Sequence, residues 1–132
     1  MKELQIKYEN EIIELVHASH RLAELGYVTS AGGNLSLRTK DNLILITPTQ
    51  TPKRLVRFED ICIVNLNGES VFVPEGKKPT GETPFHIRIM NKRPDIRSVV
   101  HAHPPLLTGF AIADSSLLAE PFSRTHTRGR PL

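Results

Sequence analysis

Residues 77–105 read KKPTGETPFHIRIMNKRPDIRSVVHAHPP, and the prediction of the fold starts from this stretch. It predicts a short helix that carries Glu82 near its start, a turn at Arg93-Pro94-Asp95, and an apolar strand that ends in His101-Ala102-His103. Side chains two residues apart leave the same face of a strand, and the two imidazoles are rooted roughly 6.6 Å apart. They could therefore share one metal ion, or they could bind only backbone groups and water.

The neighbours of the two histidines favour the metal interpretation. An acidic residue lies on the preceding helix, and Pro104-Pro105 stops the strand directly after the histidines. Catalytic zinc typically takes three protein ligands and keeps one position open, so His101 and His103 leave such a site one ligand short. Glu82 also has a simpler interpretation, because a carboxylate at a helix N-terminus complements the macrodipole by about 0.3–1 kcal/mol.

Length and composition indicate one globular domain. The chain has 132 residues, of which 39% are hydrophobic and 23% charged. Charges interrupt the apolar positions of the N-terminus, so we expect no membrane span or secretory segment and a cytoplasmic location. The single cysteine, Cys62, lies in an apolar run and cannot form an intrachain disulfide, so we expect it to fill a strand position.

The distribution of charge argues against nucleic acid as a partner. The sequence pI is about 9.2 and the formal net charge is +3. Residues 123–132, SRTHTRGRPL, hold three arginines and no acid, and the rest of the chain balances 14 basic against 14 acidic residues. A face that binds a phosphate backbone needs clustered Lys and Arg in the folded body, and no such cluster is present in the sequence.

The other predicted elements follow hydrophobic patterning. Helical spacing from about Glu3 to Leu25 predicts one N-terminal helix, with Gly26 placed for a left-handed C-cap. Alternating and apolar runs predict strands at 35–38, 43–47, 57–66 and 70–73. Asn67-Gly68 predicts a two-residue hairpin, which favours antiparallel pairing over a doubly wound parallel sheet.

Further detail is predicted for the two later helices. Thr80 or Thr83 is expected to cap the helix that follows Glu82. Phe85 and Ile89, four residues apart, are expected to face the core, and His86 is expected to be a packing residue on a neighbouring face. The run from Pro105 predicts an apolar helix behind the histidine strand.

Two loops contain groups that could hold an anion. Residues 30–34, SAGGN, lead into a strand, and glycines let backbone N–H groups approach an anion closely. Residues 48–52, PTQTP, form a stiff loop rich in hydroxyl groups. Either loop could instead be a plain turn whose polar groups satisfy its own backbone.

Four motifs in order resemble the class II aldolase/adducin family and cover roughly residues 8–122. They are Ser30–Arg38 (SAGGNLSLR), Ile46–Thr49 (ITPT), Pro79–Glu82 (PTGE), and Arg93-Pro94-Asp95 followed by Val99–Pro104 (VVHAHP). The resemblance implies an α/β protein with a three-layer α/β/α fold and a mainly antiparallel central sheet. It also implies a Zn²⁺ or another divalent metal ion, and a homotetramer with active sites near subunit boundaries.

The resemblance also implies an activity and a set of site residues. Fuculose-phosphate aldolase and its relatives cleave a small ketose phosphate to dihydroxyacetone phosphate and an aldehyde, and a related epimerase acts on pentulose 5-phosphates. Glu82 matches the catalytic acid/base, which can also ligate the metal, and His101 and His103 match two of three metal histidines. The positions that match the substrate-phosphate site are Gly33, Asn34, Thr49, Gln50, Thr80 and Gly81.

The chain departs from the family pattern at three places. Gln50 replaces a usual glycine, and Gly81 replaces a residue that often carries a hydroxyl, so the identity of the sugar stays open. The third metal histidine of the family has no counterpart, because His126 lies in the basic tail. We therefore expect a truncated family member, with an incomplete domain at 1–122 and a basic tail at 123–132 that is either a frameshifted end or a natural degenerate tail.

Two functional interpretations follow. In the first, the chain is a metal-dependent aldolase or epimerase acting on a small phosphorylated sugar. In the second, it is a catalytically silent remnant or an adducin-like interaction module that keeps the architecture without a complete site.

Overall fold

A computed structural model describes residues 2–113 of the chain, and its centre is a five-stranded sheet with strand order β4-β3-β2-β1-β5. Every neighbouring pair is antiparallel. The helices are α1 (Lys2–Lys7), α2 (Glu9–Glu24), α3 (Thr83–Lys92) and α4 (Pro105–Ile112), with short 3₁₀ turns η1 (Lys53–Leu55) and η2 (Phe58–Asp60). The strands are β1 (Asn34–Arg38), β2 (Ile44–Ile46), β3 (Cys62–Val64), β4 (Ser70–Phe72) and β5 (Ser98–His101).

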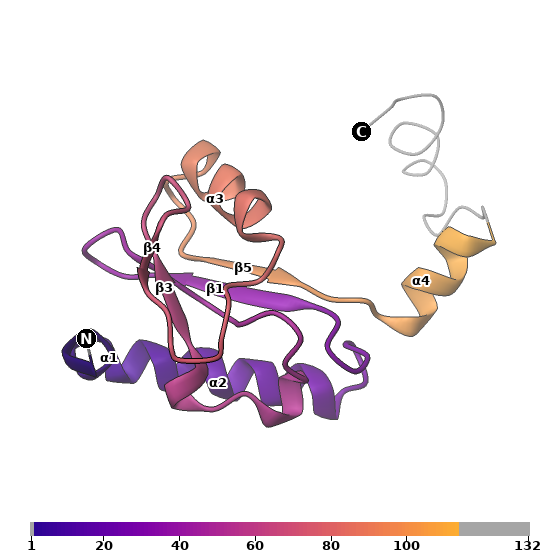
Figure 1. The fold of residues 1–132 in the computed structure, drawn as a ribbon. Helices are drawn as coiled ribbons and strands as arrows, with labels where there is room; N and C mark the ends of the chain where they lie inside the picture. Colours follow the sequence, from indigo (N-terminus) through magenta and orange to yellow (C-terminus); the bar gives the residue numbers. More distant parts are fainter. Residues whose placement is uncertain (1, 114–132) are drawn as a thin grey trace.

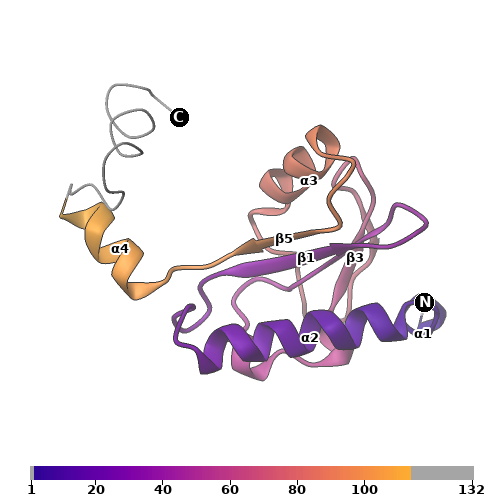
Figure 2. The same ribbon diagram turned by 180° about the vertical axis from the view of Figure 1, so that it is seen from behind.

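Helices cover both faces of the sheet, which confirms the predicted three-layer α/β/α arrangement. Figures 1 and 2 show α2 along one face and α3 across the other. Each face has its own apolar core: Ile12 and Leu15 of α2 pack with Leu35 and Leu45, and Met90 of α3 packs in the second. Alternate strand residues therefore enter opposite cores, as the pleat requires.

The N-terminal helical region is interrupted at Tyr8, where a single helix was expected. Tyr8 has non-helical backbone angles (φ −112°, ψ 30°), and its side chain is 1% exposed. Its hydroxyl donates to a carboxylate oxygen of Asp41 at 2.8 Å. This contact links α1 and α2 to the turn between β1 and β2. The predicted C-cap is confirmed, because Gly26 has φ +72°.

The hairpin between β3 and β4 differs from the two-residue turn that Asn67-Gly68 predicts. The Asn65 N–H donates to the Glu69 carbonyl, and the Asn65 side-chain oxygen accepts from the Asn67 and Glu69 amides. The turn therefore spans three residues between Asn65 and Glu69, with Gly68 at φ +82°. The Asn65 side chain favours this wider turn, because it satisfies two loop amides.

The strand predicted at 57–66 is shorter than expected, since its first part forms η2. The Asp60 carboxylate accepts from the Arg57 N–H at 3.0 Å, and the Asp60 N–H donates to the Arg57 carbonyl. These local bonds compete with strand pairing. Cys62 occupies a buried position in β3, as expected, with 0% exposure.

The predicted buried face of α3 is confirmed for Ile89, which packs against the second core, and is wrong for Phe85. Phe85 is 52% exposed, whereas His86 is fully buried with Ile87 and Met90 beside it. The N-cap is Glu82 and not Thr80 or Thr83. The ring of His86 turns inward because it hydrogen-bonds to Ser36 and Asn34 of β1. Phe85, one residue earlier and therefore about 100° around the helix, faces away from the sheet.

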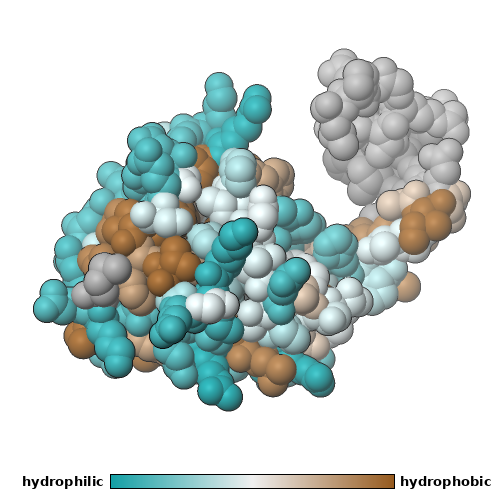
Figure 3. All heavy atoms as spheres, in the orientation of Figure 1, coloured by the Kyte–Doolittle hydropathy of each residue, from teal (hydrophilic) through white to brown (hydrophobic). Residues whose placement is uncertain are grey.

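Helix α4 forms where it was predicted but does not lie behind the histidine strand. Figure 1 shows it extending away from the sheet beyond β5, and Figure 3 shows hydrophobic residues on its surface. Leu106 and Ile112 are each about four-fifths exposed. Within residues 2–113 no helix combines the length and apolar character needed to cross a membrane. The predicted basic tail, with His126, lies outside the described residues.

Candidate active site

The sheet and two loop contacts bring the predicted site residues to one end of the molecule. Asn34 of β1 is the register partner of His101 in β5. Pro48 and Pro79 form an isolated antiparallel bridge, so the loop after β2 lies beside the loop before α3. Two backbone bonds secure this pairing, from the Thr49 amide to the Lys78 carbonyl (2.8 Å) and from the Thr80 amide to the Thr47 carbonyl (3.1 Å).

Among the described residues, Glu82 provides the only carboxylate that contacts the side chains of Asn34 and His101. At the N-cap of α3 its Oε2 accepts from the Asn34 side-chain amide at 2.8 Å and also contacts Nδ1 of His101. Partial burial raises its pKa, but the bonds from Asn34 and His101 outweigh that effect and hold the pKa below its usual range. Glu82 is therefore ionised at neutral pH, while 45% of its side chain stays accessible.

The rings of His101 and His103 lie side by side. The prediction placed both histidines on one strand, but only His101 belongs to it. β5 ends at His101, so His103 belongs to the segment that leaves the sheet. The His103 N–H donates to the Tyr27 carbonyl at 2.7 Å, which fixes the backbone at that point. The two ring centroids are 4.6 Å apart, with ring planes 45° apart.

The donor types suit a divalent metal, although residues 2–113 hold no group of three or more His, Cys, Asp or Glu side chains arranged to bind one ion. Zinc takes imidazole nitrogen and carboxylate oxygen as ligands. Glu82 contacts His101, and the His101 ring lies beside the His103 ring, so the three side chains form a row with His101 in the middle. They can contribute ligands, and a closed coordination shell requires a further donor.

A buried hydrogen-bond chain leads to Glu82 through His86. Nδ1 of His86 is 2.6 Å from the Ser36 hydroxyl, and Nε2 is 2.5 Å from the side-chain carbonyl oxygen of Asn34. The Asn34 oxygen can only accept, so the proton is on Nε2 and the Ser36 hydroxyl donates to Nδ1. Burial lowers the pKa of His86 to about 4, which keeps the ring neutral.

Sequence reasoning treated His86 as a packing residue and did not give Ser36 a role. His86 is buried, as a packing residue is, but its ring also orients the Asn34 amide so that the NH₂ group faces Glu82. The spacing of His86 four residues after Glu82 is only a weak sequence signal of this supporting role. The partners of the ring lie 50 and 52 residues away in the chain, and no local spacing relates them.

Gly33 has a conformation and a packing environment that only glycine tolerates. Its φ is +74°, and a Cβ there would lie 2.4 Å from Cγ1 of Val28 and 2.9 Å from the His101 carbonyl oxygen. The close approach of the backbone of residues 32–33 to β5 therefore depends on the absence of a side chain. Gly33 in this way contributes to the pairing that places Asn34 opposite His101.

The six positions predicted to hold phosphate differ in the donors that they leave available. The backbone N–H groups of Thr49 and Thr80 donate to backbone carbonyls, and the side-chain NH₂ group of Asn34 donates to Glu82. Within residues 2–113 no group accepts a hydrogen bond from the amides of Gln50 and Gly81. The backbone N–H of Gly33 likewise has no acceptor in that part of the chain, so Gly33, Gln50 and Gly81 provide the backbone donors of this set that an anion can use.

Comparison with known proteins agrees with this architecture. The model of the class II aldolase and adducin N-terminal domain matches residues 13–130. An L-fuculose phosphate aldolase of Methanococcus vannielii is 37% identical over 107 residues, which are 81% of this chain and 56% of that protein. A 3-oxo-tetronate 4-phosphate decarboxylase of Haemophilus influenzae is 31% identical over 101 residues, covering 76% of this chain and 47% of that protein.

A solved structure has the same fold. YgbL from Klebsiella pneumoniae, whose suggested activity is that of an aldolase, epimerase or decarboxylase, superposes with a TM-score of 0.72 at 30% identity. The match covers 78% of this chain and 48% of that one. The chain thus spans about half the length of the relatives that it matches.

Proposed function

This chain belongs to the class II aldolase and adducin family, and on that premise we propose that it is a metal-dependent aldolase. The proposed reaction cleaves a small ketose phosphate to dihydroxyacetone phosphate and an aldehyde. One observation carries the proposal: the Glu82 carboxylate is held ionised between Asn34 and His101, with His103 beside them.

The proposed chemistry uses Glu82 as the acid/base. In the cleavage direction a substrate hydroxyl loses its proton, the adjacent carbon–carbon bond breaks, and the electron pair moves to the ketone to give an enediolate. The enediolate then takes up a proton to become dihydroxyacetone phosphate. A positioned carboxylate that moves such protons typically contributes about 10²–10⁴ in rate. Glu82 suits this role because it is ionised and accessible.

His101 and His103, with Glu82, are the residues that we propose as metal ligands. A divalent ion bound there would supply Lewis-acid stabilisation of the negative charge that develops on the substrate oxygens. The remaining ligand would come from outside the described residues, and a neighbouring subunit of the tetramer implied by the family is one source.

We propose that Gly33, Asn34, Thr49, Gln50, Thr80 and Gly81 line the site for the substrate phosphate. These residues differ in the hydrogen-bond donors that they can offer to a phosphate. Gly33, Gln50 and Gly81 offer free backbone amides, whereas the Asn34 side chain acts through its contact with Glu82. Binding the phosphate at a fixed point orients the reacting carbons relative to Glu82, which lowers the entropic part of the barrier.

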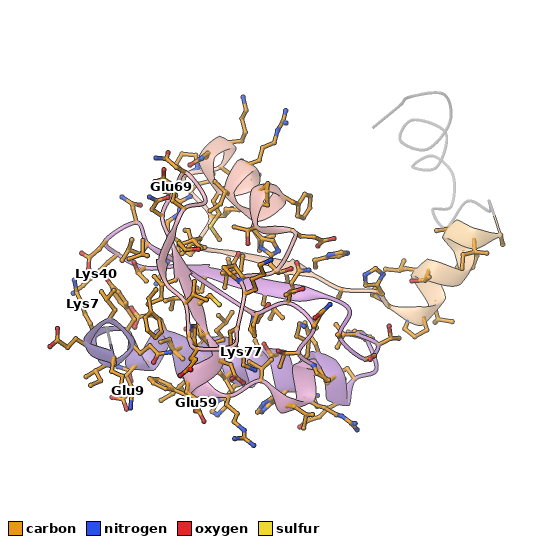
Figure 4. The ribbon with its side chains drawn as sticks, viewed as in Figure 1. Lys7, Glu9, Lys40, Glu59, Glu69 and Lys77 are labelled. Carbon is orange, nitrogen blue, oxygen red and sulfur yellow. The ribbon has the colours of Figure 1, made fainter. Side chains whose placement is uncertain are left out.

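The test is a retro-aldol assay with L-fuculose 1-phosphate and related ketose phosphates, on purified protein supplied with Zn²⁺. We expect Glu82→Gln to lower kcat by about 10²-fold or more, since the amide cannot accept a proton. Glu9→Gln is the control, because Glu9 is an exposed carboxylate in the first turn of α2, on the side of the molecule away from α3 (Figure 4). Equal turnover by the Glu82 variant and the wild type would contradict the proposal.

A second candidate is a catalytically silent module of the same family. It is favoured by the absence, within residues 2–113, of a group of three metal-ligating side chains arranged around one ion. A folded protein that binds no metal and turns over none of the sugar phosphates would support this candidate. Epimerisation or decarboxylation without cleavage to an aldehyde would instead indicate one of the other activities found among the relatives.

A further inference from the structure

Lys53 is a lysine at the start of η1 whose side chain is almost completely buried. It is 1% exposed, and no carboxylate of the described residues lies within ion-pair distance of its ammonium group. Burying an ammonium without a counter-charge is costly, and buried charges in proteins are normally paired. Lys53 therefore lacks the anion that such a position ordinarily requires.

Two other lysines near acidic groups show the usual arrangement. Lys7 forms an ion pair with Asp41 at 2.8 Å, and Lys77 with Asp60 at 3.0 Å; both lysines are labelled in Figure 4. Each of these lysines is more exposed than Lys53 and yet has a carboxylate partner. The most buried of the three has none.

The Lys53 ammonium instead binds two backbone carbonyls. Nζ donates to the Thr51 carbonyl at 2.9 Å and to the Ala31 carbonyl at 3.3 Å. These carbonyls belong to the two loops that contain Gly33 and Gln50. The carbonyls satisfy donors of Nζ but carry no net charge, and burial lowers the pKa of Lys53. A positive charge thus lies between the two loops without a counter-ion.

We propose that Lys53 supplies the positive charge of the phosphate site, and that the anion it lacks is the phosphate monoester of the substrate. This inference rests on the proposed function, because it takes the substrate to be a sugar phosphate held by these loops. The free amides of Gln50 and Gly81 donate directly to the phosphate. Lys53 acts from behind the loops through its charge, and its bonds to Ala31 and Thr51 fix the spacing of the loops.

A purely structural role for Lys53 gives a different expectation. If the side chain only ties two loops together, replacing it weakens the fold in every buffer and leaves any effect of phosphate unchanged. If its charge attracts phosphate, the replacement removes the effect of phosphate. Lys53→Met separates the two roles, because methionine keeps much of the apolar length of the side chain and loses the charge.

The experiment is thermal unfolding of the full chain with inorganic phosphate as the probe, against sodium chloride at matched ionic strength. An anion at concentration L that binds the folded state stabilises it by RT ln(1 + L/Kd), so Tm rises with the anion concentration relative to Kd. We expect phosphate to raise the Tm of the wild type, and we expect Lys53→Met to weaken the apparent phosphate Kd about tenfold or more. Lys40→Met is the control, since it removes the same charge from an exposed turn labelled in Figure 4.

Several results would overturn the inference. They are the absence of a phosphate effect in the wild type, a full effect in Lys53→Met, and an equal loss in Lys40→Met. If Lys53→Met does not fold, the ¹⁵Nζ resonance of Lys53 in the wild type decides: a shift on adding phosphate supports the inference, and an unchanged resonance refutes it. Phosphate binding through Lys53 without retro-aldol turnover would reject the aldolase proposal alone, and turnover without any Lys53 effect would reject this inference alone.

Discussion

Replacing His86 with leucine tests whether the buried hydrogen-bond chain behind Glu82 is a real part of the fold. His86 is 0% exposed, and its ring satisfies the Ser36 hydroxyl and the Asn34 side-chain oxygen. Leucine leaves both groups buried and unpaired. Each unsatisfied group costs about 1–3 kcal/mol, so we expect His86→Leu to lower the free energy of unfolding by about 2–6 kcal/mol. That is a large share of the roughly 5–15 kcal/mol typical of a domain.

The assay is denaturant unfolding of the wild type and matched variants. His86→Gln is the conservative control, because its amide can still donate to Asn34, and we expect it to lose about half as much stability as His86→Leu. Adding Ser36→Ala to His86→Leu removes one of the unpaired groups, so the double variant should regain about 1–2 kcal/mol. A His86→Leu variant within about 0.5 kcal/mol of the wild type, or a further loss on adding Ser36→Ala, would show that these hydrogen bonds do not stabilise the fold.

The pH dependence of the unfolding free energy, compared between the wild type and His86→Leu, gives an independent check. The folded pKa of His86 is about 4, below the ordinary value of 6.5, so the unfolded chain binds more protons between these pH values. The contribution of His86 is complete above pH 6.5 and is lost as the pH falls toward 4. The wild type should lose up to about 3 kcal/mol more than His86→Leu across this window. Parallel pH profiles would refute the assignment of a neutral ring.

Two further predictions concern Gly33 and Cys62. Gly33→Ala should destabilise the fold by more than Gly76→Ala in denaturant unfolding, because both positions have positive φ but only Gly33 adds a clash at 2.4 Å; equal losses would contradict the packing argument. Burial raises the pKa of the Cys62 thiol to about 12, so a thiol reagent at pH 8 should label the native protein far more slowly than the unfolded chain. Rapid labelling of the folded protein would show that β3 opens.

The sequence was sufficient for the layer architecture but not for the details that depend on distant partners. Alternating apolar positions and the Asn67-Gly68 signal predicted an antiparallel sheet, and the structure has one. The turn length was wrong because the Asn65 side chain satisfies two loop amides. The prediction for α3 was right for Ile89 and wrong for Phe85, because the ring of His86 finds buried partners in Ser36 and Asn34 and Phe85 then faces outward.

The sequence predicted which residues belong to the candidate site, but not the contacts that support them. Motif order pointed to Glu82, His101 and His103. In the structure Glu82 contacts His101 and the His101 ring lies beside that of His103, while the roles of the three residues stay predictions. The support from His86 depends on contacts across about 50 residues of chain, which local spacing does not encode. The burial of Lys53 was not predicted for a different reason, because lysine side chains are ordinarily exposed.

The zinc content of the purified protein tests the central claim most directly. We expect zinc to bind to the wild-type chain. Binding should be lost in His101→Ala and retained in His17→Ala, because His17 is exposed on α2. Zinc measured by elemental analysis after dialysis gives the stoichiometry of each variant. A wild-type protein that binds no zinc, or a His101 variant that binds as much as the wild type, would contradict the claim that Glu82, His101 and His103 share one metal ion.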